Sequence, residues 1–504
     1  MSHWIIAPVF LPAMIGPLII LLLRRDLVGQ RIVSVAATAA QLAISVGLLI
    51  HAAGGEITVY RLGNWAAPFG IVLMLDRLAA LMLVLTAVVA LVVQLYAIGS
   101  GWDRKGRHFH ALWQFQLMGL QGAFLTGDAF NLFVFFEVLL IASYGLMIHG
   151  GGELRLRAGV QYVAYNLVGS VLFLAALGTL YSVTGTLNMA DMAARIAAMP
   201  AEHSSLMRVG AALLLIVFAL KAALVPLHFW LPATYANAPG PVAALFAVMT
   251  KVGLYGIIRF CTLVFAGDAG LIALASGSLL VAALLTVVLA QLGVLGSQSL
   301  GRVAAYAALA SVGTLAVSLA GFDAAGLSAG LWYLIHSTLA AAALFLVADL
   351  VAARRGNTWL TPQPAIVQNG PVGALFMAAA IGIAGLPPLS GFQGKIAILQ
   401  ATAGSTWAIT IWAVILVTSL LSIVGLTQAG SVIFWKTDGQ QRVGADIGPA
   451  PSLAITAAAA LVALMAGLTI LGGPVMSYTQ ATAVQLLHPA DYVDAVLTRQ
   501  EGVK

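Results

Sequence analysis

The amino-acid sequence predicts an all-α polytopic membrane protein with about fourteen transmembrane helices. Of its 504 residues, 61% are hydrophobic and only 8% are charged, and the mean hydropathy is +1.02. A soluble domain carries about 25% charged residues. Apolar stretches recur along the whole chain, and about 20 apolar residues are enough for a helix to cross a bilayer. The net charge of +6 belongs mostly to short loops, so it indicates membrane orientation and not nucleic-acid binding.

Fourteen segments are long and apolar enough to be predicted spans. They are residues 4–23, 32–52, 70–98, 111–126, 129–149, 158–183, 208–237, 241–265, 270–291, 302–321, 326–351, 370–404, 406–435 and 452–472. Prolines interrupt the seventh span at Pro226 and Pro232 and the twelfth at Pro387 and Pro388, so we expect both helices to be broken there. Broken helices are tolerated inside a membrane where their backbone lines a polar cavity.

The positions of the two broken spans indicate an internal duplication. Spans 4–8 and 9–13 would form two five-helix repeats, of opposite topology because five is odd. The predicted organisation is therefore an N-terminal three-helix segment (1–110), a first repeat (111–265), a second, inverted repeat (270–435), and a last span with an extramembrane tail (436–504). Residues 187–206 form a separate amphipathic stretch, which we interpret as a surface helix ending near Pro200.

The basic residues are divided unequally between the two faces of this arrangement. Loops on one face contain only Arg61, Arg195 and Arg208. Loops on the other face contain thirteen, namely Arg24, Arg25, Arg31, Arg104, Lys105, Arg107, Arg155, Arg157, Arg302, Arg354, Arg355, Lys436 and Arg442. The positive-inside rule places the richer face in the cytoplasm, so both termini are expected outside it.

An acidic residue lies inside the fifth predicted span. Glu137 is surrounded by apolar residues, and an ionisable group at that depth is by default functional. We expect Lys221 to be its partner, because an opposite charge nearby keeps both groups ionised. The alternative is a structural glutamate that is hydrogen-bonded to a neighbouring helix.

Three lysines are also predicted to lie within spans. Lys221 directly precedes the break of the seventh span, Lys251 lies near the middle of the eighth, and Lys395 follows the break of the twelfth. A lysine at mid-membrane depth costs about 2.5–3.5 kcal/mol on insertion scales. A membrane anchor has no use for that cost, so the lysines indicate an ion pathway. For Lys395 the alternative is a half-helix end close to water.

Two histidines lie close to these lysines in the predicted arrangement. His336 is about ten residues into the eleventh span, and histidine titrates near neutrality. We interpret it as a proton relay between Lys251 and Lys395, with a hydrogen-bonded packing residue as the alternative. His228 adjoins the break of the seventh span, where a relay and a helix-end hydrogen bond are equally acceptable interpretations.

The remaining charges near span ends receive plainer interpretations. Asp76 and Arg77 are adjacent in the third span, and we expect a local or interhelical ion pair. Arg259 and Asp349 are interpreted as solvated or interfacial charges. Cys261 is the only cysteine, so an internal disulfide and a cysteine-ligated cluster are excluded. No phosphate-binding loop or metal-ligand motif is present, and no cofactor or metal is expected.

Three blocks of the chain are similar to a known family. They are FNLFVFFEVLLIASYGL around Glu137, ALKAALVPLHFWLPATYANAPGPVAALFAVMTKVGLYGIIR across spans 7 and 8, and AGLPPLSGFQGK in span 12. The chain resembles the antiporter-like membrane subunits shared by Mrp-type cation/proton antiporters and the proton-pumping arm of respiratory complex I. The resemblance covers nearly the whole chain. The D subunits of Mrp antiporters look closest, by their length and by the tail PADYVDAVL.

The resemblance implies a fold and a function. It implies fourteen helices with inverted repeats and a proton path through Glu137, Lys221, Lys251, His336 and Lys395. It also implies a subunit of a sodium/proton antiporter in the bacterial inner membrane, with other antiporter subunits, membrane lipid, protons and sodium ions as partners. The alternative is a proton-pumping subunit of a complex I-type oxidoreductase or a membrane-bound hydrogenase, which large redox subunits as partners would reveal. No Asp/Asn/Ser cluster identifies a sodium site, and lysines repel cations, so the sequence leaves the route of the cation open.

Overall fold

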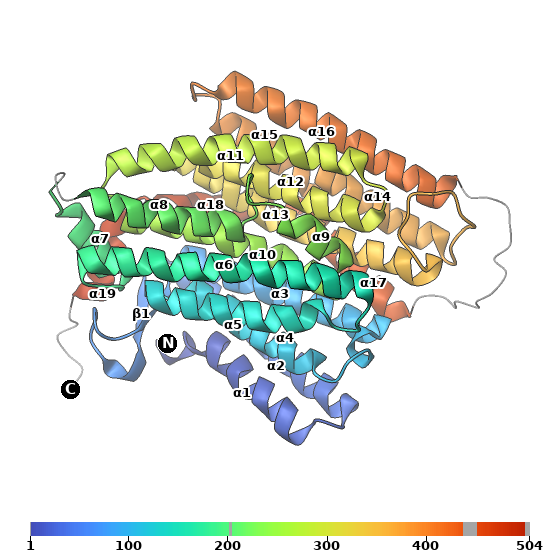
Figure 1. Cartoon of the computed structure of the whole chain (residues 1–504), viewed down its shortest axis with the longest axis horizontal. Helices are drawn as coiled ribbons and strands as arrows, with labels where there is room; N and C mark the ends of the chain where they lie inside the picture. The colour runs from blue at the N-terminus through green and yellow to red at the C-terminus, as the bar shows by residue number, and fades with distance from the viewer. Residues whose placement is uncertain (1, 201–203, 437–450, 499–504) are drawn as a thin grey trace.

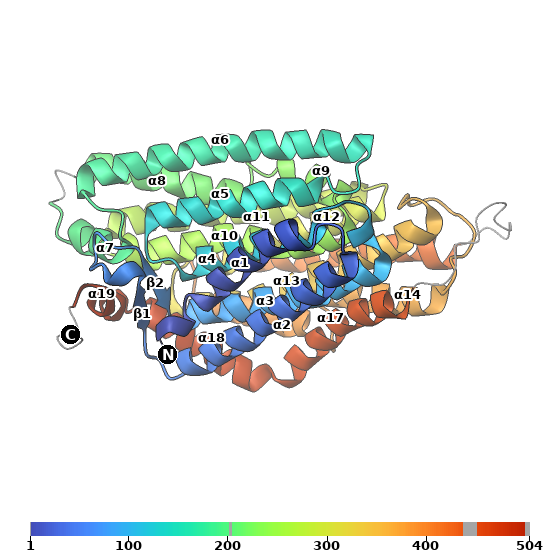
Figure 2. The same cartoon turned by 90° about the horizontal axis from the view of Figure 1, so that it is seen from below.

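Long helices running side by side make up most of the molecule (Figures 1 and 2). The computed structural model describes residues 2–200, 204–436 and 451–498. The N-terminal helices and strands are α1 (Ala7–Leu22), α2 (Leu27–Ala52), β1 (Thr58–Arg61), β2 (Val72–Leu75), α3 (Arg77–Ser100) and the 3₁₀ turn η3 (Trp102–Arg104). Strands β1 and β2 pair antiparallel, with Thr58 opposite Leu75.

The next group of helices covers the first predicted repeat. It comprises α4 (Phe109–Leu125), α5 (Ala129–Met147), α6 (Glu153–Thr184), α7 (Met189–Ala197), α8 (Ser204–Lys221), α9 (Trp230–Asn237), α10 (Gly240–Arg259) and the π-helical turn η5 (Phe260–Val264). The short helix α7 lies where the surface helix was predicted, and it ends before Pro200. Residues 201–203 of that prediction lie outside the described residues.

The last group covers the second predicted repeat and the C-terminal segment. It comprises α11 (Ala269–Gly296), α12 (Leu300–Leu319), α13 (Ala324–Arg355), α14 (Asn369–Ala384), α15 (Ser390–Ala401), α16 (Ala408–Gly430), the π-helical turn η6 (Ser431–Trp435), α17 (Ser452–Ile470), α18 (Gly472–Leu486) and α19 (Pro489–Leu497). Helix α18 packs against α13 and α3, and α19 packs against α7. Arg442 and residues 499–504 of the tail lie outside the described residues.

Side-chain caps explain where several of these helices begin. A side-chain oxygen that accepts a hydrogen bond from a backbone N–H of the first turn satisfies a donor that has no partner within the helix. The capping residues of α2, α3, α5, α11, α12 and α13 are Asp26, Asp76, Asp128, Asp268, Ser299 and Asp323. The cap of α3 also corrects a prediction. The third span was expected to begin at residue 70, but residues 72–75 form a fully buried strand and the helix begins only after Asp76.

The architecture is that of an all-helical, polytopic membrane protein with one small β-hairpin. Eleven helices among the described residues are long and apolar enough to cross a membrane, and α1 and α14 are shorter apolar helices. The count of fourteen spans and the repeat boundaries therefore stay predictions. Both predicted helix breaks are confirmed, because residues 222–229 separate α8 from α9 and residues 385–389 separate α14 from α15.

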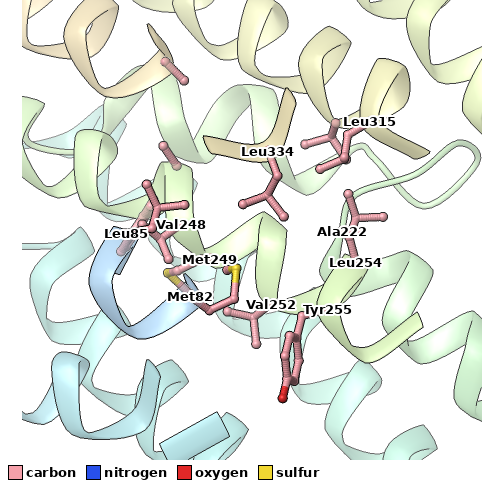
Figure 3. Close-up of a cluster of buried hydrophobic side chains, with 14 of the residues drawn as sticks. Met82, Leu85, Ala222, Val248, Met249, Val252, Leu254, Tyr255, Leu315 and Leu334 are labelled. Carbon is pink, nitrogen blue, oxygen red and sulfur yellow. The ribbon is translucent and has the colours of Figure 1, made fainter. Parts of the chain in front are cut away.

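The core is built around two helices that the rest of the bundle encloses. Every residue of α10 is buried, and α13 packs against α10, α12, α14, α15, α17 and α18. Figure 3 shows the side chains of Met82 and Leu85 on α3 close to Val248, Met249 and Val252 on α10. Helices α7 and α19 and the hairpin gather at one end of the bundle (Figure 2). Because α3 runs away from β2, η3 lies at the opposite end.

Candidate functional site

Glu137 on α5 is held by the neighbouring helix α6. Its Oε1 atom accepts a hydrogen bond from the hydroxyl of Ser170. The glutamate side chain is half-buried, whereas the serine is buried. Helix α6 thus supplies a neutral partner for this acid within the membrane-spanning part of the fold.

Lys221 is the last residue of α8, directly before the break. Its Nζ atom donates a hydrogen bond of 3.3 Å to Oδ1 of Asn166 on α6, and it lies 5.9 Å from the centre of the Phe136 ring. The residue is only 5% exposed. The carbonyl of Leu220 at the helix end accepts hydrogen bonds of 3.0 Å from the backbone N–H of Ala223 and 3.0 Å from Nε1 of Trp230. The break therefore keeps its backbone partly satisfied while it leaves the lysine in the protein interior.

The expected partnership of Glu137 and Lys221 is electrostatic in this structure and does not include a direct contact. The two residues interact electrostatically but form no ion pair in the part of the chain that the structure describes. Instead each binds a residue of α6, and Asn166 and Ser170 lie one helical turn apart on the same face. The sequence carried a signal for these two residues, since their spacing of four puts both polar groups on one face of an otherwise apolar segment.

Lys251 lies at the centre of the fully buried helix α10. Its exposure is 0%, and its Nζ atom has no hydrogen-bond partner among the described residues. Burial of an ammonium group without a partner is costly, and a protein retains such a group only where another gain offsets that cost. The expected position of this lysine inside a span is confirmed, but within the described residues it forms no hydrogen bond with another predicted site residue.

His336 on α13 links the two sides of the break between α14 and α15. Its Nε2 atom lies 3.1 Å from the carbonyl oxygen of Gly382, and its Nδ1 atom lies 2.8 Å from Oγ of Ser390. A carbonyl can only accept, so Nε2 carries the hydrogen and the serine hydroxyl donates to Nδ1 of the neutral ring. A Cβ atom on Gly391 would lie 2.0 Å from the Gly382 carbonyl oxygen, so only glycine fits where the break passes the histidine.

Lys395 on α15 folds back onto the end of α14. Its Nζ atom donates hydrogen bonds of 2.7 Å to the carbonyl of Ala384 and 2.8 Å to the hydroxyl of Ser419 on α16. The C-terminus of a helix carries a partial negative charge, which stabilises an ammonium group there. Lys395 itself lies inside α15, and the helix end that its ammonium group contacts belongs to α14.

One narrow polar cavity joins two of the predicted site residues. His336 and Lys395 both line it, between helices α11 to α16. Its other polar lining residues are Gln291, Ser311, Thr314, Tyr333, Ser337, Thr418 and Ser419. The structure thus arranges the predicted path as a pair of charges held by α6, an isolated lysine on α10, and a histidine and a lysine that share a cavity.

Arg259 is not the solvated charge that its place near a span end indicated. Its guanidinium is 3% exposed and forms two hydrogen bonds, of 2.5 and 3.0 Å, with the carboxylate of Asp76. The interhelical ion pair predicted for Asp76 is therefore confirmed, with a partner on α10. Arg77 donates instead to the backbone carbonyl of Ala53, at 2.8 Å.

Asp349 is half-buried, as an interfacial charge can be. Its carboxylate accepts hydrogen bonds of 2.7 Å from the Tyr96 hydroxyl and 2.9 Å from Nε1 of Trp102. The turn η3 therefore partly covers the carboxylate. The burial of Arg259 depends on Asp76, which is far away in the sequence, so the residues around its span end do not reveal it.

His228 and Cys261 add no further chemistry to the site. The imidazole of His228 stacks beside Phe229 with the ring centres 4.4 Å apart, and its Nδ1 atom has no hydrogen-bond partner among the described residues. The single cysteine is buried and free. Within residues 2–200, 204–436 and 451–498, no group of three or more His, Cys, Asp or Glu side chains could hold a metal ion.

Comparison with known proteins identifies the family. The family described as "NADH:quinone oxidoreductase/Mrp antiporter, TM" matches residues 126–422, more than half of the chain. The chain belongs to this family. It is 39% identical to the D subunit of a probable K(+)/H(+) antiporter from Rhizobium meliloti, over 99% of this chain and 98% of that protein. It is 36% identical to the D subunit of the Na(+)/H(+) antiporter from Bacillus subtilis, over 99% of this chain and all of that protein. These relatives place it among the D subunits of Mrp-type antiporters.

Solved structures agree with this assignment. A chain of the Mrp complex from Dietzia sp. matches 99% of this chain with a TM-score of 0.88 and 28% identity, and all of that chain is covered. A chain of respiratory complex I from Thermus thermophilus matches 96% of this chain with a TM-score of 0.79 and 25% identity, and 99% of that chain is covered. The antiporter-like fold is therefore shared with a redox-driven complex as well as with an antiporter.

Proposed function

We propose that this chain is the proton-translocating subunit of a multi-subunit monovalent cation/proton antiporter driven by the proton gradient. The observation that carries the proposal is the placement of ionisable groups at both helix breaks, with Lys221 at the first and His336 and Lys395 at the second. Ionisable groups at such depth mark ion paths and proton relays. The names of the relatives favour an antiporter over an oxidoreductase subunit.

The first charge pair works as a switch in this proposal. Lys221 binds Asn166, and Glu137 binds Ser170 one turn further along α6. A short movement of the lysine ammonium along α6 brings it to the glutamate. That movement changes the electrostatic potential along the rest of the path. Each of the two side chains makes a single hydrogen bond in the described contacts, so one incoming ion is enough to favour one position of the lysine over the other.

The second part of the path carries the proton. Lys251 has no hydrogen-bond partner among the described residues and can accept or release a proton without breaking one. The ring of His336 lies between Gly382 and Ser390, and Lys395 lines the same cavity as His336. Transfer from Lys251 through His336 to Lys395, or the reverse, moves a proton between the first and the second repeat.

The proposal includes the finer architecture and setting. Fourteen spans, inverted repeats of spans 4–8 and 9–13, and both termini outside the cytoplasm accord with the fold and with the charge distribution of the loops. The partners are the other subunits of the antiporter, membrane lipid, protons and sodium or another monovalent cation. The setting is the bacterial inner membrane.

The test measures collapse of a respiration-driven pH gradient in everted membrane vesicles. The host lacks its own antiporters and expresses this chain together with its partner subunits, either unchanged or with Glu137→Gln. Addition of sodium or potassium should collapse the gradient only with the unchanged chain. The matched control is Glu153→Gln, which alters an exposed glutamate at the start of α6 and should leave the response intact.

Immunoblotting of the membranes separates function from folding. If Glu137→Gln removes the protein from the membrane, the residue is structural and the proposed switch is wrong. If neither cation changes the gradient with the unchanged chain, and redox subunits co-purify with it, the antiporter function is wrong and the oxidoreductase alternative applies.

A further inference from the structure

A second run of buried polar side chains lies outside the proposed proton path. It follows the contact between α2, α3 and α4, and we call it the α2–α4 seam. Its members are at most 1% exposed, and they are Ser34, Thr38, Gln41, Ser45, Thr86, Gln94, His110, Gln114 and Gln121. Polar side chains often join membrane helices by hydrogen bonds, so the question for this interface is which of its polar atoms have partners.

Hydrogen bonds join the three helices in the part of the seam around Ser34, whereas the amide of Gln41 donates to the Pro8 carbonyl of α1. Oγ of Ser34 on α2 accepts hydrogen bonds from Nε2 of Gln94 on α3, at 2.6 Å, and of Gln114 on α4, at 3.0 Å. Gln114 also reaches Oγ1 of Thr38, at 3.1 Å. Further along α4, Gln121 donates to the backbone of α3. On α4 the seam runs from His110 to Gln121. Their separation of eleven residues corresponds to about 17 Å along the helix axis.

Many seam atoms lack a partner, and all of them are oxygens. Among the described residues, no hydrogen bond reaches six side-chain oxygens, namely Gln41 Oε1, Ser45 Oγ, Thr86 Oγ1, Gln94 Oε1, Gln114 Oε1 and Gln121 Oε1. A buried acceptor without a donor costs free energy, and six along one seam form a consistent pattern. Neutral carbonyl and hydroxyl oxygens are the groups that replace the hydration shell of an alkali cation in a membrane protein.

A buried carboxylate stands at the η3 end of the seam. Asp103 is fully buried and binds the guanidinium of Arg31 through two hydrogen bonds, of 2.6 and 2.9 Å. Nε2 of His110 lies 3.3 Å from the same carboxylate. Burial by itself raises the pKa of Asp103, but the hydrogen bonds from His110 and Arg31 and the charge of Arg31 outweigh it, so the pKa lies below its usual value. The Arg31 side chain is 19% exposed, so this end of the seam opens toward the end of the bundle.

An apolar layer separates the seam from the proposed proton path. Met82 and Leu85 of α3 meet Val248 and Met249 of α10 in the dry cluster of Figure 3, on the same helix as Lys251. A cation that followed the lysines would be repelled by each of them. The seam offers oxygens without an ammonium group along it, and the apolar layer keeps the two routes apart.

We propose that the α2–α4 seam is a binding path for the monovalent cation, with Asp103 at its mouth and the unpaired oxygens as ligands. The proposal rests on the antiport function above, because an antiporter needs a cation route and the lysines do not provide one. In this arrangement Arg31 closes the mouth by occupying the carboxylate. Displacement of its guanidinium exposes a negative charge that draws a cation toward the amide oxygens.

The test uses the silver ion as a thiol-reactive monovalent cation. In the complete complex in membranes, Cys261→Ser first removes the only native thiol of this chain. Ser45→Cys then places a thiol at an unpaired seam oxygen, and Val248→Cys places one in the dry cluster. After a pulse of Ag⁺, the protein is denatured and the remaining free thiols are alkylated with a mass tag. The seam thiol should react at least about tenfold faster than the control thiol, and excess Na⁺ or K⁺ should slow its reaction.

Two results would overturn the proposal. One is equal, slow silver labelling at both positions, which would make the seam a dry structural contact. The other is fast labelling that neither Na⁺ nor K⁺ slows, which would make it a water path without cation binding. If Ser45→Cys fails to assemble, Thr38→Cys gives the same comparison. Labelling needs no transport, so its outcome is separate from that of the Glu137→Gln assay.

A functional measurement completes the test. Gln114→Met keeps the side-chain length but removes the unpaired oxygen together with the amide that donates to Ser34 and Thr38, and it should raise the cation concentration for half-maximal antiport by about tenfold, which equals about 1.4 kcal/mol. The maximal rate should change much less, because the proton path is untouched. An equal fall in maximal rate with an unchanged half-maximal concentration would contradict cation binding at the seam.

Discussion

The two broken spans hold their lysines in opposite ways. In the first, Lys221 ends the helix before the break and makes one hydrogen bond of 3.3 Å, to a side chain of another helix. In the second, Lys395 follows the break and makes two bonds, of 2.7 and 2.8 Å, one of them to the backbone at the end of α14. The first lysine is loosely held beside an acid, whereas the second is fixed by its own span.

This difference indicates a division of labour. A charge that switches must have two accessible positions of similar free energy, and a single long hydrogen bond next to a second acceptor provides them. A charge that receives or releases a proton at the end of a path benefits from a fixed position. His336 reinforces the second break through Gly382 and Ser390, whereas His228 at the first break has an Nδ1 atom without a partner among the described residues.

The largest effect on stability is expected when alanine replaces a glycine beside one of the two helix breaks. Gly391→Ala would place a Cβ atom 2.0 Å from the Gly382 carbonyl, and this backbone atom cannot move aside. We expect a loss of more than about 3 kcal/mol in the free energy of unfolding, as for severe overpacking. Gly169→Ala meets instead the end of the flexible Leu220 side chain, at 2.6 Å. Thermal unfolding of both purified variants measures the difference, and equal stability would show that the second break is no more rigid than the first.

The next effect compares the hydrogen-bond partners of the two lysines. Asn166→Ala removes the side-chain hydrogen bond of Lys221, whereas Ser419→Ala leaves Lys395 bound to the Ala384 carbonyl. A lost hydrogen bond to a charged group costs about 1.5–3 kcal/mol, or about 10- to 150-fold in an equilibrium. Antiport rates in vesicles should therefore fall much further for Asn166→Ala. A larger fall for Ser419→Ala would reverse the assignment of switch and fixed end.

A smaller effect is expected at the two histidines. His336→Ala leaves the Ser390 hydroxyl without its partner, which costs about 1–3 kcal/mol for a buried group, whereas the Gly382 carbonyl still accepts from the backbone N–H of Gly385. His228→Ala removes a half-buried ring with an unpaired nitrogen and should cost less. Denaturation midpoints and antiport rates of both variants test this, and the comparison fails if His228→Ala is the more damaging change.

The smallest effect concerns an exposed pair at the start of the first broken span. The hydrogen bonds and charge of Arg208 lower the pKa of Asp268, which also caps α11. A carboxylate with a depressed pKa contributes stability above its unfolded pKa of about 3.9, and this contribution disappears as the pH falls through the folded value. Asp268→Asn keeps a good cap, so only the charge is lost. Its melting temperature should lie slightly below that of the unchanged protein at pH 6 and should converge with it in acid, whereas a constant difference would exclude the ion pair as its cause.

Sequence patterns alone indicated the class of fold and the main site residues. Membrane-spanning segments must be apolar, so length and hydropathy reveal them, and Glu137, Lys221, Lys251, His336 and Lys395 stand out as ionisable groups within such segments. Prolines also indicated both breaks, because a proline in a helix interior removes a backbone hydrogen bond, although Pro12 and Pro17 lie inside α1 without interrupting it.

The partners of those groups were decided by the tertiary structure. Asn166 and Ser170 each bind one of the two charges expected to be partners, Arg259 is buried against Asp76 from a distant helix, and Asp349 is hydrogen-bonded by Tyr96. The seam between α2, α3 and α4 likewise exists only because three polar faces meet. A span shows its own apolar length in its sequence, but which face meets which neighbour depends on packing between segments far apart in the chain. The sequence therefore revealed where charge enters the membrane, and only the folded bundle determined what each charge contacts.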